Sequence, residues 1–350
     1  MLGAAALWLA SLAPAGAAES KRDNVGAYKL ADGPCAVEIV KDIVLRDAKR
    51  NKDLPVHLTF PRADGKFPII VFSHGAGGSG DTVLAGLPKF WSSHGYICLV
   101  PTHADSIKLR RQQGERDASM MDVATRALSR KEEWENRPRD ITFLLDSLDE
   151  LEKKVPALRG RLDRSRIGVG GHSFGAFTAQ VVGGATLDIA GDGKPKSLAD
   201  PRVKAVLQLS GQGRGQMGLH EHSWKAMNLP MMCVTGSLDR GAQGQDPSWR
   251  KEPFDRSPPS DKYFVFIEGA HHLSFTGPLW TESGRGGLLA GRFGRGRAGS
   301  GDAKAIFEWV KSATIAFWDA SLRQDRQART WLQSDSISQV SQRKARLERR

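Results

Sequence analysis

A serine stands between two glycines where the sequence changes from an apolar run to a helical pattern. The segment RIGVGGHSFGAF places Ser173 in a Gly-x-Ser-x-Gly pattern between Gly171 and Gly175. The residues before Ser173 are typical of a buried strand, and those after it favour a helix over 174–182. So tight a strand-to-helix turn needs glycines because a Cβ at either position would collide with neighbouring backbone. The pattern predicts that the Ser173 hydroxyl is lifted out of the sheet as a nucleophile.

A carboxylate and a histidine follow two later strand-like runs. A serine hydroxyl is a weak nucleophile and needs a base whose ring is held by a carboxylate. Asp239 follows the run PMMCVTG, and His271 and His272 follow the run KYFVFIEG. Because the carboxyl ends of parallel strands meet at one edge of a sheet, we expect these groups to lie near Ser173. Adjacency alone leaves both histidines as alternatives for the base.

A glycine-rich loop could supply part of the stabilisation that attack by a serine requires. Negative charge develops on the carbonyl oxygen during attack, and two fixed N–H donors must stabilise it. The residue after the nucleophile, Phe174, supplies one donor. The loop HGAGGSG at 74–80 follows the apolar run FPIIVFS, and its backbone can turn a second amide inward. It lacks the Gly-Lys-Ser/Thr ending of a phosphate-binding loop, so no nucleotide site is expected.

Other features that could indicate a ligand lack the partners that a site needs. His220 and His222 flank Glu221, but no third ligand stands nearby, so neither a metal nor another cofactor is expected. The formal net charge is +12, yet the basic residues are spread along the chain without a nucleic-acid-binding motif. Nucleic acid is therefore not the expected partner. Peripheral contact with anionic surfaces fits this charge better, and the sequence carries no signal for the oligomeric state.

Strands and helices alternate along most of the chain, and they must position these groups. Strands are expected over 36–47, 55–61, 67–73, 96–102, 166–173, 203–210, 230–236 and 262–269, and helices over 87–94, 174–182 and 303–322. A further helix with one apolar face is expected from Pro138 to Leu151. This alternation predicts an α/β protein with a mostly parallel central sheet flanked by helices, its first two strands antiparallel at one edge.

The chain is expected to form one large domain between two terminal segments. Residues 1–18 are apolar, rich in small side chains and free of acidic groups, which predicts a signal peptide and a secreted or periplasmic protein. The domain would span 19–333, with 104–135 as an insertion that is a candidate lid. A Gly/Arg-rich segment at 283–301 is expected to be a surface connection, and 334–350 a basic C-terminal tail.

Six segments resemble the dienelactone-hydrolase-like branch of the α/β hydrolases and the plasma-type platelet-activating-factor acetylhydrolases. They are VFSHGAGGS, RPRDITFLLDSL, VGGHSFGAF, DPRVKAVLQLS, VTGSLDR and EGAHHLSF. The resemblance runs from about Val37 to Trp331 and implies an α/β-hydrolase fold with esterase activity. It also implies a catalytic histidine three residues before a phenylalanine, a spacing that His272 meets. The family pattern places the second oxyanion amide two residues after the loop histidine, at Ala76.

The residues and the resemblance together predict a serine esterase that cleaves small-molecule or lipid carboxylic esters through an acyl-enzyme. In this scheme His272 takes the proton from Ser173, and Asp239 stabilises the imidazolium. The amides of Phe174 and Ala76 hold the oxyanion. One alternative is a peptidase or amidase with the same triad, although the sequence displays no site for an amine leaving group. Another is a non-catalytic binding protein of the same fold, whose usual mark would be a broken triad.

Overall fold

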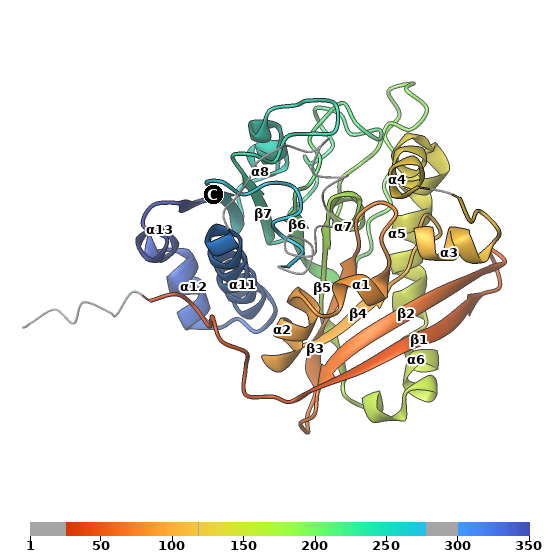
Figure 1. Cartoon of the computed structure of the whole chain (residues 1–350), viewed down its shortest axis with the longest axis horizontal. Helices are drawn as coiled ribbons and strands as arrows, with labels where there is room; N and C mark the ends of the chain where they lie inside the picture. Colours follow the sequence, from red (N-terminus) through yellow and green to blue (C-terminus); the bar gives the residue numbers. More distant parts are fainter. Residues whose placement is uncertain (1–25, 118, 278–299) are drawn as a thin grey trace, which may run out of the picture.

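A nine-stranded sheet runs through the computed structural model, which describes residues 26–117, 119–277 and 300–350 (Figure 1). The strands are β1 (Val37–Asp47), β2 (Lys52–Pro61), β3 (Phe67–Ser73), β4 (Ile97–Pro101), β5 (Leu162–His172), β6 (Val203–Leu209), β7 (Met231–Gly236), β8 (Lys262–Ile267) and β9 (Ala345–Arg349). Their order is β1-β2-β4-β3-β5-β6-β7-β8-β9. All neighbours from β4 to β8 are parallel, whereas the β1–β2, β2–β4 and β8–β9 pairs are antiparallel.

Burial along the strands explains why short apolar runs form this sheet. β4 and β7 are buried at every residue, as parallel strands are when helices cover both faces. β1 instead has mostly exposed or half-buried residues, which suits its place at the sheet edge. The mostly parallel sheet with its antiparallel opening strands confirms the expected α/β-hydrolase fold.

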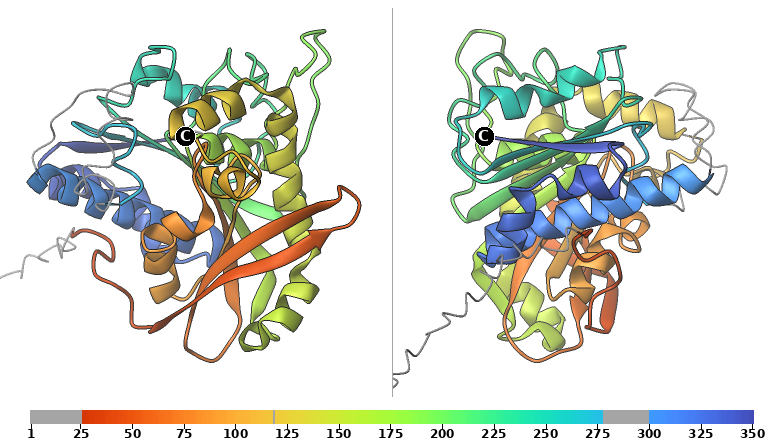
Figure 2. Two further views of the ribbon diagram at one scale, coloured as in Figure 1. Left: turned by 45° about the vertical axis from the view of Figure 1, so that its right-hand side comes forward. Right: turned by 90° about the vertical axis from the view of Figure 1, so that its left-hand side faces the viewer.

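Helices cover both faces of the sheet (Figures 1 and 2). On one face lie α5 (Lys131–Asp146), α6 (Leu148–Lys154) and α7 (Phe174–Val182), and on the other lie α2 (Leu87–Ser93) and α11 (Ser300–Leu322), with α12 (Arg326–Leu332) against α11. The other α-helices of the described residues are α1 (Gly80–Val83), α3 (Ile107–Gln112), α4 (Met120–Ser129), α8 (Glu252–Arg256) and α13 (Ser336–Val340). The apolar core is accordingly divided into two clusters, one on each side of the sheet.

The helix expected from Pro138 begins earlier, at Lys131. Glu132 and Glu133 lie in its first turn, where acidic groups interact favourably with the helix dipole. The apolar periodicity becomes visible only from Ile141 because charged side chains dominate the preceding turns. Hydrophobic spacing therefore located the helix but not its start.

The structure differs from the expectation of a separate basic tail at 334–350. This segment forms α13 and β9, and β9 pairs with β8 from Tyr263–Arg349 to Ile267–Ala345. Ala345 is fully buried. The charged sequence of β9 hid this strand, because an edge strand can carry many charged side chains while still pairing through its backbone.

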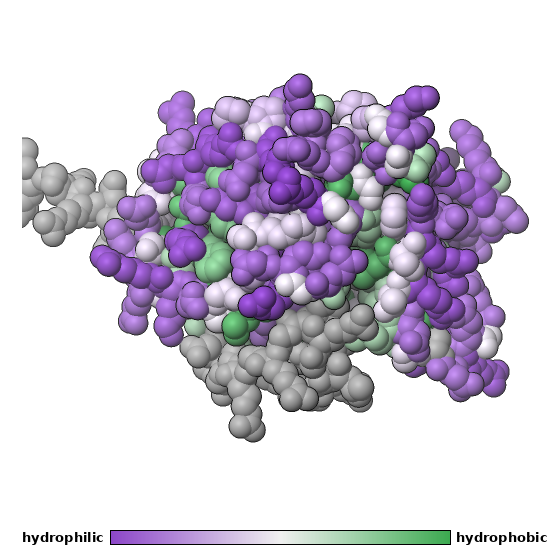
Figure 3. Space-filling view, turned by 90° about the horizontal axis from the view of Figure 1, so that it is seen from above, coloured by the Kyte–Doolittle hydropathy of each residue, from purple (hydrophilic) through white to green (hydrophobic). Residues whose placement is uncertain are grey.

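Two segments singled out in the sequence fall outside the described residues. The predicted signal peptide at 1–18 lies there completely, as does the Gly/Arg-rich segment apart from its last two residues. Among the helices that are described, none combines the length and the apolar character that crossing a membrane requires. Viewed from above, the coloured surface is largely hydrophilic, with hydrophobic residues in small separate areas (Figure 3).

Candidate active site

The turn between β5 and α7 holds Ser173 in an unusual backbone conformation. Its φ is 55° and its ψ is −119°, a region that residues with a side chain rarely adopt and that concentrates at functional sites. A Cβ on Gly171 would lie 2.3 Å from the Gly175 carbonyl carbon, and one on Gly175 would lie 1.9 Å from the Ser73 carbonyl oxygen. Both glycines are thus required by close backbone contacts, for the reason expected from the sequence.

A buried histidine–aspartate pair lies at the ends of the last two parallel strands. Asp239 follows β7 and His272 follows β8, and His272 Nδ1 is 2.9 Å from Asp239 Oδ1. His272 and Ser173 line the same pocket. His271 is half-buried, and its Nδ1 accepts instead from the Leu273 amide at 3.3 Å. The structure therefore brings His272 to Asp239, and it holds His271 by contacts within its own loop.

Asp239 is surrounded by groups that favour its carboxylate form. The hydroxyls of Ser210 and Thr235 donate to Oδ2 at 2.5 and 2.9 Å, and Arg250 Nε lies 3.1 Å from Oδ1. Burial would raise the pKa of Asp239, but the Arg250 charge and the hydrogen bonds from His272 and Ser210 outweigh it. They hold this pKa well below its usual range, so Asp239 is ionised at neutral pH.

His272 is arranged as a neutral base. Because Nδ1 faces a carboxylate, it carries the hydrogen, and Nε2 is the nitrogen that can accept a proton. Burial lowers the pKa of His272, Asp239 opposes that effect, and Arg250 adds to the lowering. The net pKa lies below the ordinary histidine value of about 6.5. His272 can therefore take a proton from a serine hydroxyl at neutral pH.

Arg250 is a buried cation beside this pair that sequence analysis did not identify. It lies in the turn Pro247–Lys251 and also lines the pocket. Its guanidinium donates to the carbonyl oxygens of Asp239 and Arg240 at 2.9 and 3.0 Å, and to those of Ser210 and Gly211 at 2.7 and 2.9 Å. It thus joins the loops after β6 and β7 next to the histidine.

His172, the residue before the nucleophile, also contacts the base. Its Nε2 donates to the His272 carbonyl oxygen at 2.7 Å, and the two rings lie 4.8 Å apart between centroids. Burial lowers the pKa of His172 to about 3, with the nearby His272 as a further cause. The neutral ring ties the end of β5 to the loop that carries the base.

The two amides expected to hold an oxyanion lie on separate elements. Ala76 belongs to the loop after β3, and Phe174 is the first residue of α7. In the described part of the chain, neither of these N–H groups donates to a protein acceptor. The next amide along the loop, that of Gly77, donates to Asp105 Oδ2 at 2.9 Å. Ala76 also lines the pocket beside Ser173.

The pocket next to Ser173 is walled mainly by apolar side chains. The apolar members are Ala76, Val83, Met120, Ala124, Leu128, Ala242, Trp249 and Leu273; the polar members besides Ser173 and His272 are His74, Thr82, His172, Gln212, Gln216, Arg250 and Thr276. Three of them, at 120, 124 and 128, are four residues apart on α4 and share one helix face. The expected insertion at 104–135 thus contributes one wall of the pocket. Its role as a lid stays a prediction.

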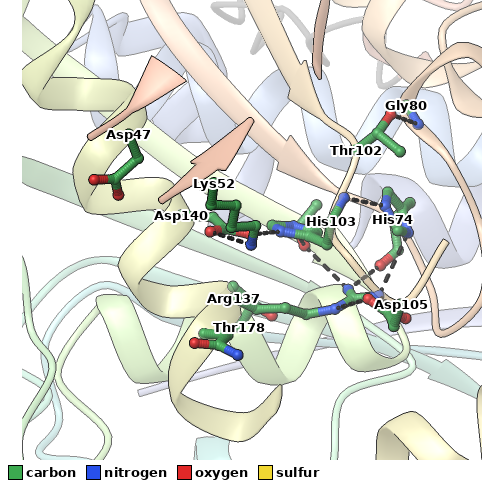
Figure 4. Close-up of polar contacts among 12 residues, drawn as sticks. Asp47, Lys52, His74, Gly80, Thr102, His103, Asp105, Arg137, Asp140 and Thr178 are labelled. Atoms are coloured by element: carbon green, nitrogen blue, oxygen red, sulfur yellow. Dashed lines mark hydrogen bonds and ion pairs between the residues drawn. The ribbon is translucent and has the colours of Figure 1, made fainter. Parts of the chain in front are cut away.

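A second serine–histidine–aspartate arrangement lies deeper in the protein. Ser73 Oγ is 2.9 Å from His103 Nε2. Figure 4 shows the other contact, in which His103 Nδ1 is 2.9 Å from Asp140 Oδ2. All three residues are buried, and none lines the pocket. Burial lowers the pKa of His103 to about 4, with a nearby arginine as a further cause. This arrangement has the geometry of a triad but no space for a substrate, so we assign it a structural role.

One sequence signal could have revealed this buried polar group. Asp140 lies one helical turn before Leu144, on the apolar face of α5. A charged residue on such a face needs a buried partner. No role was predicted for Asp140 from the sequence.

Comparisons with known proteins point in the same direction as the geometry. Residues 36–144 match the family described as "Platelet-activating factor acetylhydrolase, isoform II". The chain is 26% identical over 191 residues to cutinase est2 of Thermobifida alba, a match that covers 53% of this chain and 55% of that protein. Cutinase est1 of the same organism is 27% identical over 191 residues, covering 53% and 56%.

These matches are partial. The family match ends before Ser173, and the chain spans about half the length of the curated relatives it matches. The names of the matched family and relatives, an acetylhydrolase and two cutinases, are those of hydrolases. The sheet topology shows an α/β-hydrolase fold, and the partial matches show that the chain is similar to proteins named as esterases.

Proposed function

We propose that the protein hydrolyses carboxylic esters through an acyl-enzyme formed on Ser173. One observation carries this proposal: a strained serine turn opens into the same pocket as a histidine whose Nδ1 contacts a buried carboxylate at 2.9 Å. Serine hydrolases need these three groups in that relation. The relatives named as cutinases support an ester as the substrate.

The proposed reaction assigns one step to each group. His272 Nε2 takes the proton as Ser173 Oγ bonds to the ester carbonyl carbon, and the carbonyl oxygen becomes negative. The amides of Ala76 and Phe174 donate to that oxygen. When the intermediate collapses, the C–O bond to the alcohol breaks and His272 gives its proton to the leaving oxygen. Water, activated by the same histidine, then releases the acid and restores Ser173.

The pocket favours an uncharged acyl group. No carboxylate is among its described lining residues, and Arg250 donates four hydrogen bonds to backbone carbonyl oxygens. The apolar face of α4 can pack against an aliphatic or aromatic chain. We therefore expect neutral esters of modest size as substrates.

The cations of the expected insertion at 104–135 are partly neutralised by neighbouring carboxylates. Lys108 pairs with Asp81 at 2.9 Å, and Arg110 pairs with Glu115 at 3.0 Å. Local ion pairs reduce the net charge that these side chains present to a lipid surface. Contact with anionic surfaces therefore stays a prediction, as does secretion.

Hydrolysis of p-nitrophenyl esters of increasing acyl length, measured beside the matching p-nitroanilides, tests the proposal. We expect turnover of the esters, little turnover of the anilides, and no turnover of either in the Ser173→Ala variant. Faster cleavage of the anilides would identify an amidase instead. Ester turnover that survives in Ser173→Ala would overturn the assignment of the nucleophile.

A further inference from the structure

The two proposed oxyanion donors come from separate elements, and one buried side chain contacts both. Arg137 lies in α5 with its side chain fully buried, and it does not line the pocket. Figure 4 shows it extending toward His74, on the loop after β3, and toward Asp105, which follows β4. Sequence analysis assigned no role to this residue, although it belongs to the segment RPRDITFLLDSL.

Arg137 holds the carbonyl groups on one side of the oxyanion loop. Its Nη1 donates to the His74 carbonyl oxygen at 2.6 Å, and its Nη2 donates to the Gly75 carbonyl oxygen at 3.2 Å. The Gly75 oxygen also accepts from the Gly78 amide at 3.1 Å and from His74 Nδ1 at 2.7 Å. Three donors therefore converge on a single carbonyl.

That carbonyl belongs to the same peptide unit as the Ala76 amide. In a planar trans peptide the C=O and N–H bonds point in opposite directions, and this chain has no cis peptide among its described residues. With the Gly75 oxygen held toward Arg137, the Ala76 N–H must point to the other side, away from the guanidinium. If this peptide flipped, a carbonyl oxygen would take the place of the donor and repel an oxyanion.

Asp105 accepts from the amide of the next peptide of the loop, Ala76–Gly77, and Arg137 holds the Asp105 carboxylate in place. Arg137 Nε and Nη2 donate to its two carboxylate oxygens at 2.9 and 2.7 Å, and Oδ2 accepts from the Gly77 amide at 2.9 Å. Burial would raise the pKa of Asp105, but the Arg137 charge outweighs it and holds the pKa well below its usual range. This two-pronged ion pair has a geometry that lysine cannot reproduce.

The same guanidinium also packs on the residue that supplies the other donor. Its central carbon lies 4.2 Å from the centroid of the Phe174 ring. Phe174 is buried, so neither partner of this cation–π contact can move freely. Arg137 thus connects the loop that carries Ala76 to the start of α7.

The buried polar group behind the loop supports this arrangement. His74 Nε2 accepts from the His103 amide at 3.1 Å, so Nδ1 carries the hydrogen that it donates to Gly75. Burial lowers the pKa of His74 well below its usual value, and the Arg137 charge adds to that effect. A neutral His74 with a fixed tautomer follows, and it helps to orient the loop carbonyl.

We propose that Arg137 is a positioning residue that keeps the oxyanion hole formed before substrate binds. It does so by orienting the Gly75–Ala76 peptide and by joining that peptide to Phe174. This inference rests on the proposed esterase function. It makes Arg137 important for stabilising the transition state, even though the residue touches neither substrate nor triad.

A matched pair of substrates separates this role from a merely structural one. The sulfur of a thionoester accepts hydrogen bonds poorly, so an enzyme with a formed oxyanion hole prefers the ordinary ester over its thiono analogue. We expect Arg137→Lys and Arg137→Met to lower kcat for the p-nitrophenyl ester by about 10- to 100-fold, because removing one donor outright costs about 10²- to 10³-fold. KM and the pH at which activity falls should change little, and thionoester turnover should fall much less. The ratio of the two rates should therefore shrink.

Arg161 offers a matched control. Its guanidinium packs on Phe60 and Phe67 with centroid distances of 5.6 and 5.3 Å. Phe67 begins β3 at the end of the sheet opposite the nucleophile, so Arg161→Lys should leave the rate ratio unchanged. If Arg137→Met does not fold, Asp105→Asn supplies the second variant, and it should shrink the ratio as well.

The rate ratio also distinguishes failure of this inference from failure of the proposed function. Wild-type protein that hydrolyses no ester and whose Ser173 does not react with a fluorophosphonate would overturn both. Active wild-type protein with an unchanged ester-to-thionoester ratio in Arg137→Lys and Asp105→Asn would overturn the role of Arg137 alone. A shrunken ratio in both variants, with Arg161→Lys like wild type, is the result we expect.

Discussion

Replacing Arg250 by glutamine should raise the pH at which esterase activity is lost on the acid side. The base works only when neutral, so kcat/KM falls as the pH drops through the pKa of His272. Burial and then the Arg250 charge lower that pKa, while Asp239 raises it. His172 and His271 are the other titratable groups near the ring, and burial keeps both of their pKa values low. Removing the Arg250 charge therefore takes away a lowering influence.

The size of this shift follows from the distance and the surroundings. Arg250 Nη2 lies 3.4 Å from His272 Nδ1. Two unit charges about 4 Å apart interact by about 1 kcal/mol in water and about 4 kcal/mol at an effective dielectric constant of about 20. The site opens into a pocket, so we take the lower part of that range. At about 1.4 kcal/mol per pKa unit, the acid limb should move up by about one pH unit.

The measurement is kcat/KM for a soluble neutral ester as a function of pH, in wild type, Arg250→Gln and Arg250→Lys. The position of the acid limb does not depend on how much of the enzyme is active, so partial loss of folded protein does not disturb it. Arg250→Lys keeps a charge nearby and should shift the limb less than Arg250→Gln. An acid limb that stays in place, or moves to lower pH, in Arg250→Gln would refute this electrostatic reasoning.

Three further outcomes follow from the structure. His272→Ala should reduce kcat by several orders of magnitude, whereas His271→Ala should cost less than about tenfold; the opposite ranking in steady-state assays would move the base to His271. Gly175→Ala should destabilise the fold by about 3 kcal/mol or more in denaturant unfolding, because its Cβ would lie 1.9 Å from a backbone oxygen; a near-neutral change would contradict the tight turn. Deleting 345–350 should lower the unfolding temperature, since β8 would lose its edge partner; an unchanged temperature would argue that β9 contributes nothing to stability.

The features that sequence analysis predicted are those encoded by neighbouring residues. The strand before Ser173 and the glycines around it form one continuous pattern, and the buried strands are short apolar runs. Asp239 and His272 could be proposed because each follows such a run, and strand ends meet at one edge of a parallel sheet. Fold class, Ser173 and Asp239 were therefore within reach of local reasoning, whereas the choice of His272 over His271 came from the family resemblance.

The features that it missed depend on contacts between distant parts of the chain. Arg250 binds carbonyl oxygens on loops that precede it by up to 40 residues, and Arg137 binds a loop more than 60 residues upstream. A buried arginine that serves backbone carbonyls looks like any surface arginine in the sequence. β9 was missed for a related reason, because a charged edge strand has no apolar run. In each case a partner elsewhere in the chain, rather than the local sequence, explains why the arginine is buried or the strand is paired.

The central claim is that Ser173 forms a covalent acyl intermediate, and mass spectrometry of the protein during turnover tests it most directly. Rapid acid quenching after mixing with a slowly deacylating ester should reveal one added acyl group, which peptide mapping should place on Ser173. The Ser173→Ala variant should carry none. An acyl group on another residue, such as Ser73 of the buried arrangement, or sustained turnover without any covalent intermediate on Ser173, would contradict the account.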